Sequence, residues 1–208
     1  MPARSSAYYQ RRHRERLREK GLVKKEVWIL PEFNDELAAT ERRMRQPRGM
    51  GSQPAHPGRT VVNEGKGWSA VGLYEALASI EQTARGEIAA ELLEGVEPSV
   101  LITMREYGDL PLFLAVGGEQ IVIEALLWPV DQVRDRAQFN QEVLRTHKLF
   151  PLSTIGIQTL ADGSESYIMF GALSGGSTLS DIVFEIETLA DNVIKATEAY
   201  ESHLQLAA

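Results

Sequence analysis

VLITMREYGDLPLFLAVGGEQIVIEALLW, residues 100–128, is the stretch of sequence that decides the fold. It holds three short apolar runs, at about Ser99–Glu106, Pro111–Val116 and Glu119–Leu127. Tyr107-Gly108-Asp109 separates the first two runs, and Gly117-Gly118 separates the last two. Gly-Gly between apolar runs is typical of a tight hairpin, because the favoured turns need positive φ. Connections this short predict antiparallel neighbours in one sheet.

Both faces of this predicted sheet are apolar. Residues of alternate strand positions share a face, and one face carries Val100, Ile102, Met104, Leu112, Leu114, Val116, Ile121, Ile123, Ala125 and Leu127. The other face carries Leu101, Phe113, Ala115, Val122, Leu126 and Trp128. A sheet that is apolar on both sides needs cover on both sides. The sequence therefore predicts helices over one face and a further layer, or a partner, over the other.

Charge divides the 208 residues into two unlike parts. Residues 1–60 hold 14 Lys and Arg against 7 Asp and Glu, whereas residues 61–208 hold 8 against 22. A basic arm joined to an acidic body suggests different partners for the two parts, or an arm that lies on its own body. The chain has no cysteine, which excludes disulfides, thiolate metal sites and a cysteine nucleophile. No apolar run approaches a membrane span or a secretory signal, and we expect a cytoplasmic protein.

The basic arm, residues 1–45, is predicted to fold as helix, strand and helix. Ser5–Lys20 is rich in helix formers, Lys24–Leu30 favours a strand ended by Pro31, and Asp35–Arg45 favours a second helix. The arginine-rich helix, Gly21-Leu22 and the run Val27-Trp28-Ile29-Leu30-Pro31 resemble the start of MazE-like antitoxins, which are grouped with ribbon-helix-helix DNA binders. That unit has two helices after its strand, and this chain offers one.

The cations of the arm are the candidate binding residues for nucleic acid or for an acidic partner surface. They are Arg11, Arg12, Arg14, Arg16, Arg18, Lys24 and Lys25. Contact with nucleic acid, contact with a protein and a merely solvated helix, partly neutralised by Glu15 and Glu19, all remain open at this stage.

The body is predicted to follow a linker, Gln46–Gly67, that is rich in glycine and proline. Within residues 68–208 the expected helices span about Ser69–Ala84, Asp131–His147 and Thr178–Leu204, with a short helical turn in Gly86–Glu94. Val133, Ala137, Val143 and Leu144 are expected to face inward from the second of these. A second hairpin is expected from Thr154–Leu160 and Ser166–Leu173, with its turn at Asp162-Gly163. The class is thus α+β, an α-βββ-α-ββ-α two-layer antiparallel sheet with helices.

This order of elements is similar to that of type III secretion chaperone-like proteins. Three stretches of the body carry a further likeness: Phe139-Asn140 with His147–Ser153, Tyr167–Ser174, and Glu185–Asn192. In these stretches the body resembles the YjfI-like uncharacterised bacterial family. The resemblance implies a chaperone or adaptor domain that commonly dimerises, and an association with phage-shock-protein-A-like membrane-remodelling proteins.

The sequence offers little catalytic chemistry. The four histidines, His13, His56, His147 and His203, do not have metal-ligand spacing. The turn Ser174–Thr178 does not match a phosphate-binding loop and is interpreted as a helix cap. Glu185, Glu187 and Asp191 are interpreted as the solvated face of the last helix. We therefore expect a protein that is not an enzyme and needs no cofactor or metal.

The function predicted from these observations is that of a non-enzymatic cytoplasmic adaptor or chaperone-like module. We expect it to form a homodimer and to bind a protein partner, a phage-shock-protein-A-like coiled-coil protein being the one that the resemblance implies. The expected interface residues are Phe113, Leu126, Trp128, Tyr200 and Leu204. The alternative is a DNA-binding transcriptional regulator that uses the basic arm.

Overall fold

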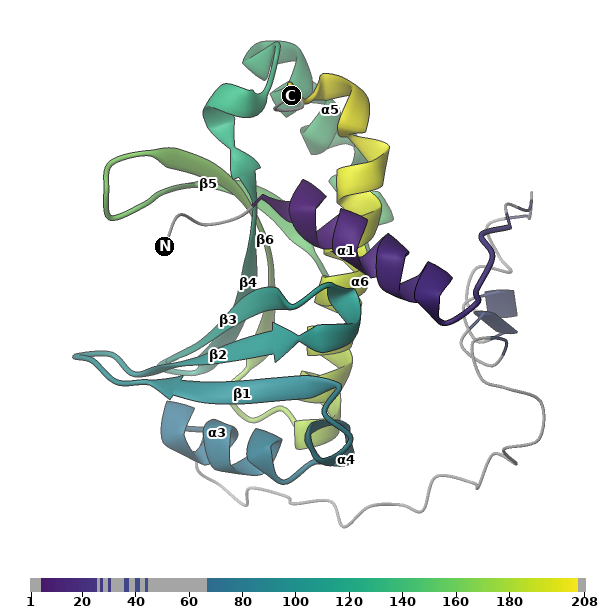
Figure 1. Ribbon diagram of the computed structural model, residues 1–208. Helices are drawn as coiled ribbons and strands as arrows, with labels where there is room; N and C mark the ends of the chain where they lie inside the picture. Colours follow the sequence, from purple (N-terminus) through teal and green to yellow (C-terminus); the bar gives the residue numbers. More distant parts are fainter. Residues whose placement is uncertain are drawn as a thin grey trace.

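Six antiparallel strands form one sheet in the order β1-β2-β3-β4-β6-β5 (Figure 1). The computed structural model describes residues 5–25 and 67–205, together with positions 27, 30, 36, 37, 40, 41 and 44. The strands are β1 (Ile88–Leu93), β2 (Ser99–Met104), β3 (Leu110–Gly117), β4 (Gln120–Pro129), β5 (Thr154–Thr159) and β6 (Glu165–Ser174). The hairpins of β3 with β4 and of β5 with β6 turn where the glycine signals predict.

Five α-helices have both ends among the described residues, and several 3-10 turns accompany them. The helices are α1 (Ser6–Glu19), α3 (Ala70–Ala78), α4 (Glu81–Ala84), α5 (Arg136–Thr146) and α6 (Leu179–Ala199). Side chains cap three of them: the Ser69, Asp135 and Thr178 oxygens accept backbone N–H bonds at the starts of α3, α5 and α6. Thr178 and Asp181 form a complete capping box, which fixes where α6 begins.

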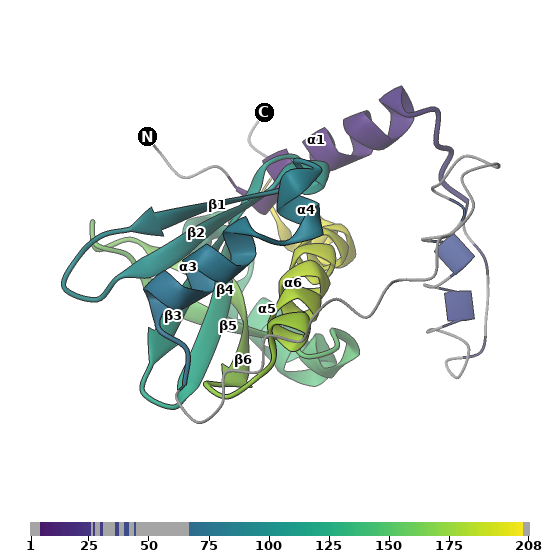
Figure 2. The same cartoon turned by 90° about the horizontal axis from the view of Figure 1, so that it is seen from below.

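The core lies between one face of the sheet and the helices α3 and α6. Helix α3 packs on β1 and β2, and α6 packs on β4 and β6 (Figures 1 and 2). The sheet contributes fully buried aliphatic side chains at alternate positions, among them Ile102, Leu112, Leu114 and Ile123. At the α5 end the core becomes aromatic, because Trp128, Phe139, Tyr167 and Tyr200 pack edge to face or tilted against one another.

The α+β class and the antiparallel sheet are confirmed, but the sheet has one strand more than predicted. Gly86–Glu94, expected as a helical turn, contains β1, which pairs with β2 over its whole length. Its residues Ala89, Ala90 and Leu92 are good helix formers, and strand pairing at the sheet edge overrides that local preference.

Three helix predictions also needed correction. The helix expected over Ser69–Ala84 is divided into α3 and α4, with Ser79 and Ile80 between them. The helix expected from Asp131 starts at Arg136, capped by Asp135, after a 3-10 turn at Val130–Gln132. Within it Phe139 and Val143 are buried, while Ala137 and Leu144, which were expected to face inward, are exposed. The last helix stops at Ala199, and a 3-10 turn at Glu201–His203 follows.

Part of the predicted arm lies outside the described residues. This applies to three of the seven residues of the expected strand Lys24–Leu30, to six of the eleven residues of the helix Asp35–Arg45, and to all of the linker Gln46–Gly67 except its last residue. Among the described residues, no helix has the length and apolar character needed to cross a membrane.

Candidate functional site

One face of the sheet is left without a helix by the described part of the chain, and we name it the open face. In Figure 1, α3 and α6 lie on one side of the curved sheet, and no helix covers the other side. Strand register places apolar side chains of four strands next to one another on it. They are Leu101, Phe113, Ala115, Val122, Leu126, Ile168 and Phe170. Most are half-buried, Ala115 is exposed and Ile168 is buried.

Glu124 lies in the middle of the open face. Its cross-strand neighbours are Phe113 of β3 on one side and Phe170 of β6 on the other. Its carboxylate makes no ion pair with a described residue, and burial raises the pKa of that carboxyl above its usual value. An unpaired acid among aromatic side chains is costly, and a cation brought to it from outside would offset that cost.

The predicted interface residues divide between the open face and the core. Phe113 and Leu126 lie on the open face and are half-buried. Trp128, Tyr200 and Leu204, by contrast, are core residues with no more than 3% of their surface exposed, which differs from the surface position that we expected.

Local backbone geometry explains the difference for these three residues. A register shift between Leu126 and Pro129 interrupts the alternation of β4 and turns Trp128 toward α5 and α6. Beyond α6 the chain folds back, so that Leu204 forms an isolated bridge with Val133. The Tyr200 hydroxyl is hydrogen-bonded to Thr146 of α5 at 2.7 Å.

The basic helix α1 docks on its own body. It packs against α6 and against the 3-10 turn Arg105–Tyr107 between β2 and β3. His13 stacks on Tyr107 with ring centroids 5.1 Å apart, and its Nδ1–H donates to the Glu106 carbonyl at 2.6 Å. On the α6 side, the hydroxyl of Thr197 donates to Ser6 Oγ at 2.8 Å in a buried contact.

Gly108 allows this close docking. Its φ is +80°, and a Cβ atom there would lie 2.5 Å from the Tyr9 carbonyl oxygen and 2.8 Å from Cβ of Arg12. A larger residue would therefore both strain the turn and push α1 away.

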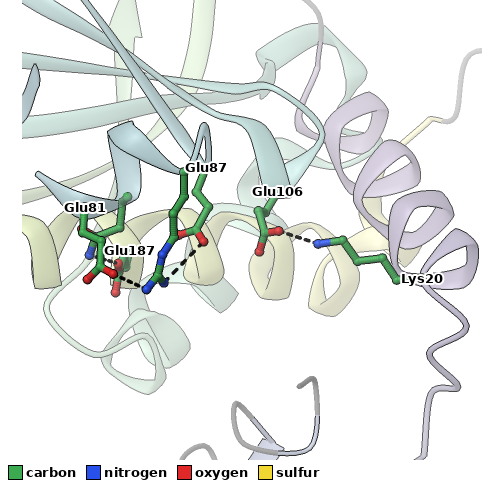
Figure 3. A network of polar contacts seen from close by, with 7 residues as sticks. Lys20, Glu81, Glu87, Glu106 and Glu187 are labelled. Carbon is green, nitrogen blue, oxygen red and sulfur yellow. Dashed lines mark hydrogen bonds and ion pairs between the residues drawn. The ribbon is translucent and has the colours of Figure 1, made fainter. Parts of the chain in front are cut away.

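Ion pairs surround these contacts. Arg12 and Arg16 both reach Asp109, at 2.7 and 3.0 Å. Lys20 pairs with Glu106, and Figure 3 shows this pair. Arg14 and Lys24 pair with Glu198 of α6. The hydrogen bond from Lys24 is the largest influence on Glu198 and holds the pKa of its carboxyl below the usual range.

The predicted nucleic-acid cations are thus divided into two groups. Arg12, Arg14, Arg16 and Lys24 are engaged by carboxylates of the body. The remaining three are exposed and make no ion pair with a described residue: Arg11, Arg18 and Lys25. The sequence left several interpretations of the arm open. For α1, the interpretation in which the arm lies on its own body is the correct one.

A buried carboxylate lies where the three stretches behind the family resemblance meet. Glu185 of α6 is 1% exposed, and its Oε1 occupies the space that a Cβ atom on Gly171 of β6 would fill. The carbonyl oxygen of Leu152 lies 3.1 Å from the same point. Asn192 holds this loop by donating to the Pro151 carbonyl and to Ser153 Oγ at 2.8 and 2.9 Å.

Burial alone raises the pKa of Glu185 to about 7, because no charged group compensates the desolvation. Its Oε1 has no hydrogen-bond partner among the described residues. The interpretation of Glu185 as part of a solvated helix face is therefore wrong. A signal was present in the sequence: residue 185 is three positions after Ile182 and four before Leu189, which places it on the apolar stripe of α6.

A shallow hollow of about 410 Å³ adjoins this place. His147, Lys148 and the loop Phe150–Thr154 line it on one side, and Phe170–Ala172 line it on the other. His147 Nδ1 is hydrogen-bonded to Thr154 Oγ1 at 2.8 Å. No group of three or more histidine and carboxylate side chains suitable for a metal ion occurs among the described residues.

Comparison with solved structures finds two partial likenesses. One is an uncharacterised protein from Methanothermobacter thermautotrophicus, with a TM-score of 0.47 and 11% identity over 64% of this chain and 99% of that one. The other is YbjN from Escherichia coli, with a TM-score of 0.41 and 12% identity over 58% of this chain and 87% of that one. Neither likeness bears on function.

The sequence relatives are closer. The chain is 38% identical to the uncharacterised protein YjfI of Escherichia coli K12 over 107 residues, which are 51% of this chain and 80% of YjfI. The YjfI protein of Escherichia coli O157:H7 matches to the same extent. This agrees with the YjfI-like resemblance in the body. A family model described as an uncharacterised protein conserved in bacteria (DUF2170) matches residues 67–204, and the chain belongs to that family.

Proposed function

We propose that this protein is a non-enzymatic protein-binding module, an adaptor or chaperone-like domain whose binding surface is the open face. The observation that supports this is the contiguous set of apolar side chains from four strands that the described helices leave uncovered. Apolar sheet faces are normally covered, and large uncovered apolar patches on soluble proteins mark interaction sites.

The partner that binds the open face is expected to be a different protein and not a second copy of this chain. A twofold axis through the middle of the open face would bring two Glu124 carboxylates together in a desolvated interface. Repulsion between these like charges would weaken the dimer, so a homodimer through the open face is the alternative proposal. A phage-shock-protein-A-like coiled-coil protein, which the family resemblance implies, is the first partner to assay.

A DNA-binding regulator is less favoured. Four of the seven candidate cations are occupied by Asp109 and Glu198, and the surface that surrounds α1 is acidic. DNA contact through α1 would require those pairs to break first.

The test is quantitative co-purification from bacterial cells with matched variants. Ala115→Arg places a bulky cation on the open face at an exposed position, and Val71→Arg places the same side chain on α3 at a position 44% exposed. We expect Ala115→Arg to remove the partners that the unmodified chain retains, and Val71→Arg to retain them. Equal retention by both variants, with both folded by circular dichroism, would contradict the proposal.

A further inference from the structure

We infer that the occupant of the open face is a basic amphipathic helix of another protein, which places a lysine or arginine from its apolar stripe against Glu124. This inference rests on the proposed function, since it names the partner of the same surface. Three features of the described residues lead to it: the position of Glu124, the charge around the face, and the way in which this chain binds its own basic helix.

The position of Glu124 selects a cation. The carboxylate stands between Phe113 and Phe170 on neighbouring strands, and no described residue pairs with it. A purely apolar partner would seal the acid into the interface without a counter-charge, at a large cost in free energy. A partner with one cation inside an apolar stripe would instead gain a desolvated ion pair, and that requirement discriminates between partners.

The β1 side of the open face and the end of the sheet that carries the β1–β2 and β3–β4 turns are also acidic, whereas Lys148 lies on the β6 side, in the hollow beside Phe170. Glu91 of β1 lies opposite Leu101, in the cross-strand row that continues through Phe113 to Glu124. The turn between β1 and β2 carries Glu94 and Glu97, and Glu119 lies in the β3–β4 turn at the same end of the sheet. These four carboxylates are exposed, and none pairs with a described residue. They would steer a basic segment toward the face.

A helix fits the geometry better than a strand. The open face presents side chains, not the unpaired backbone of a sheet edge, and sheets are covered by helices in layered folds. The chain already binds one basic helix in this manner: α1 stacks His13 on Tyr107 and sets Arg12 and Arg16 against Asp109. The body therefore already binds one basic helix through an aromatic contact combined with carboxylate ion pairs.

The experiment is selection from a displayed library of 18-residue helices against the full-length protein. Seven positions on one side of each helix are varied among leucine, phenylalanine, alanine, lysine, arginine and glutamate, and the remaining positions are held constant. Binders are counter-selected against Ala115→Arg, so that only binders of the open face are kept. We expect lysine or arginine at one central stripe position.

Charge exchange at Glu124 then tests the pairing itself. The selected helix should bind Glu124→Gln about tenfold or more weakly, whereas Glu75→Gln, at an exposed position on α3, should leave its affinity unchanged. Glu124→Lys should abolish binding of the selected helix. Binding to this variant should return when glutamate replaces the stripe cation of the helix. Enriched helices without a stripe cation, or equal effects of Glu124→Gln and Glu75→Gln, would overturn the inference and leave the proposed function standing. No binder sensitive to Ala115→Arg would overturn both.

Discussion

At the scale of single residues, Glu185 is the side chain whose environment is least expected from its type. It is a carboxylate with 1% exposure, no compensating charge and an acceptor oxygen left without a partner among the described residues. Its burial depends on Gly171, since any other residue there would collide with the carboxyl group. The pair Glu185 and Gly171 therefore links α6 to β6 at the point where the loop Phe150–Ser153 closes over them.

The pKa of Glu185 predicts how stability depends on pH. A folded pKa of about 7, against an ordinary value of 4.5, means that the native state binds more protons than the unfolded state between these values. Stability should therefore fall as pH rises from about 4.5 to about 7, by an amount on the order of 3 kcal/mol at one pKa unit per 1.36 kcal/mol.

Glu185→Gln tests this expectation. The amide stays neutral, so the variant should be more stable than the unmodified chain at pH 8 and similar to it near pH 5, as measured by urea unfolding. Glu187→Gln, two positions along the same helix, is the control and should leave the pH dependence unchanged. A pH profile that Glu185→Gln fails to flatten would show that Glu185 titrates normally.

At the scale of elements, the docking of α1 depends on a few polar contacts around one stacked ring pair. Exposed ion pairs are each worth about 0.2–1 kcal/mol, and those of Arg12, Arg16 and Lys20 act together on a single turn. We expect the double variant Asp109→Asn with Glu106→Gln to increase amide hydrogen exchange in α1 about tenfold. Glu165→Gln, which removes an ion pair to Arg136, should not change it. Unchanged exchange in the double variant would mean that the ring stack and the buried hydroxyl contact suffice.

How far the sequence predicts each element depends on how local the signal is. The β3–β4 and β5–β6 hairpins follow from Gly117-Gly118 and Asp162-Gly163, because their turns need particular residues. Strand β1 could not be predicted, since Ala89-Ala90-Glu91-Leu92 favours a helix and only pairing with β2 makes it a strand. The register shift that buries Trp128 depends on α5 and α6 packing, which no local pattern reveals.

At the scale of the whole molecule, the sequence shows that both sheet faces are apolar but not which of them is covered. The helices α3 and α6 lie at opposite ends of the body in sequence, and both pack on the same face of the sheet. The other face is open because of this topology. The charges are also divided between the two ends of the sheet. The acidic body binds its own basic helix at the β2–β3 turn, and the carboxylates at the other end of the sheet are exposed.

This arrangement predicts how the chain behaves toward DNA. Any affinity should reside in α1, fall steeply with salt, and be abolished when Arg11, Arg12, Arg14 and Arg16 are changed to alanine. Since carboxylates compete for the same cations, Asp109→Asn with Glu106→Gln should raise the affinity for a short duplex in an anisotropy titration. Affinity that is indifferent to both changes would place the contact elsewhere.

Cross-linking from the open face tests the central claim most directly. A photo-reactive phenylalanine analogue at Phe113 of the full-length protein, irradiated in bacterial cells, should give a discrete protein adduct. The same analogue at Phe184, an aromatic residue of α6 that is 54% exposed, should give none. An adduct at Phe113 alone would support the open face as the binding surface. No adduct at Phe113, or the same adduct from Phe184, would contradict it.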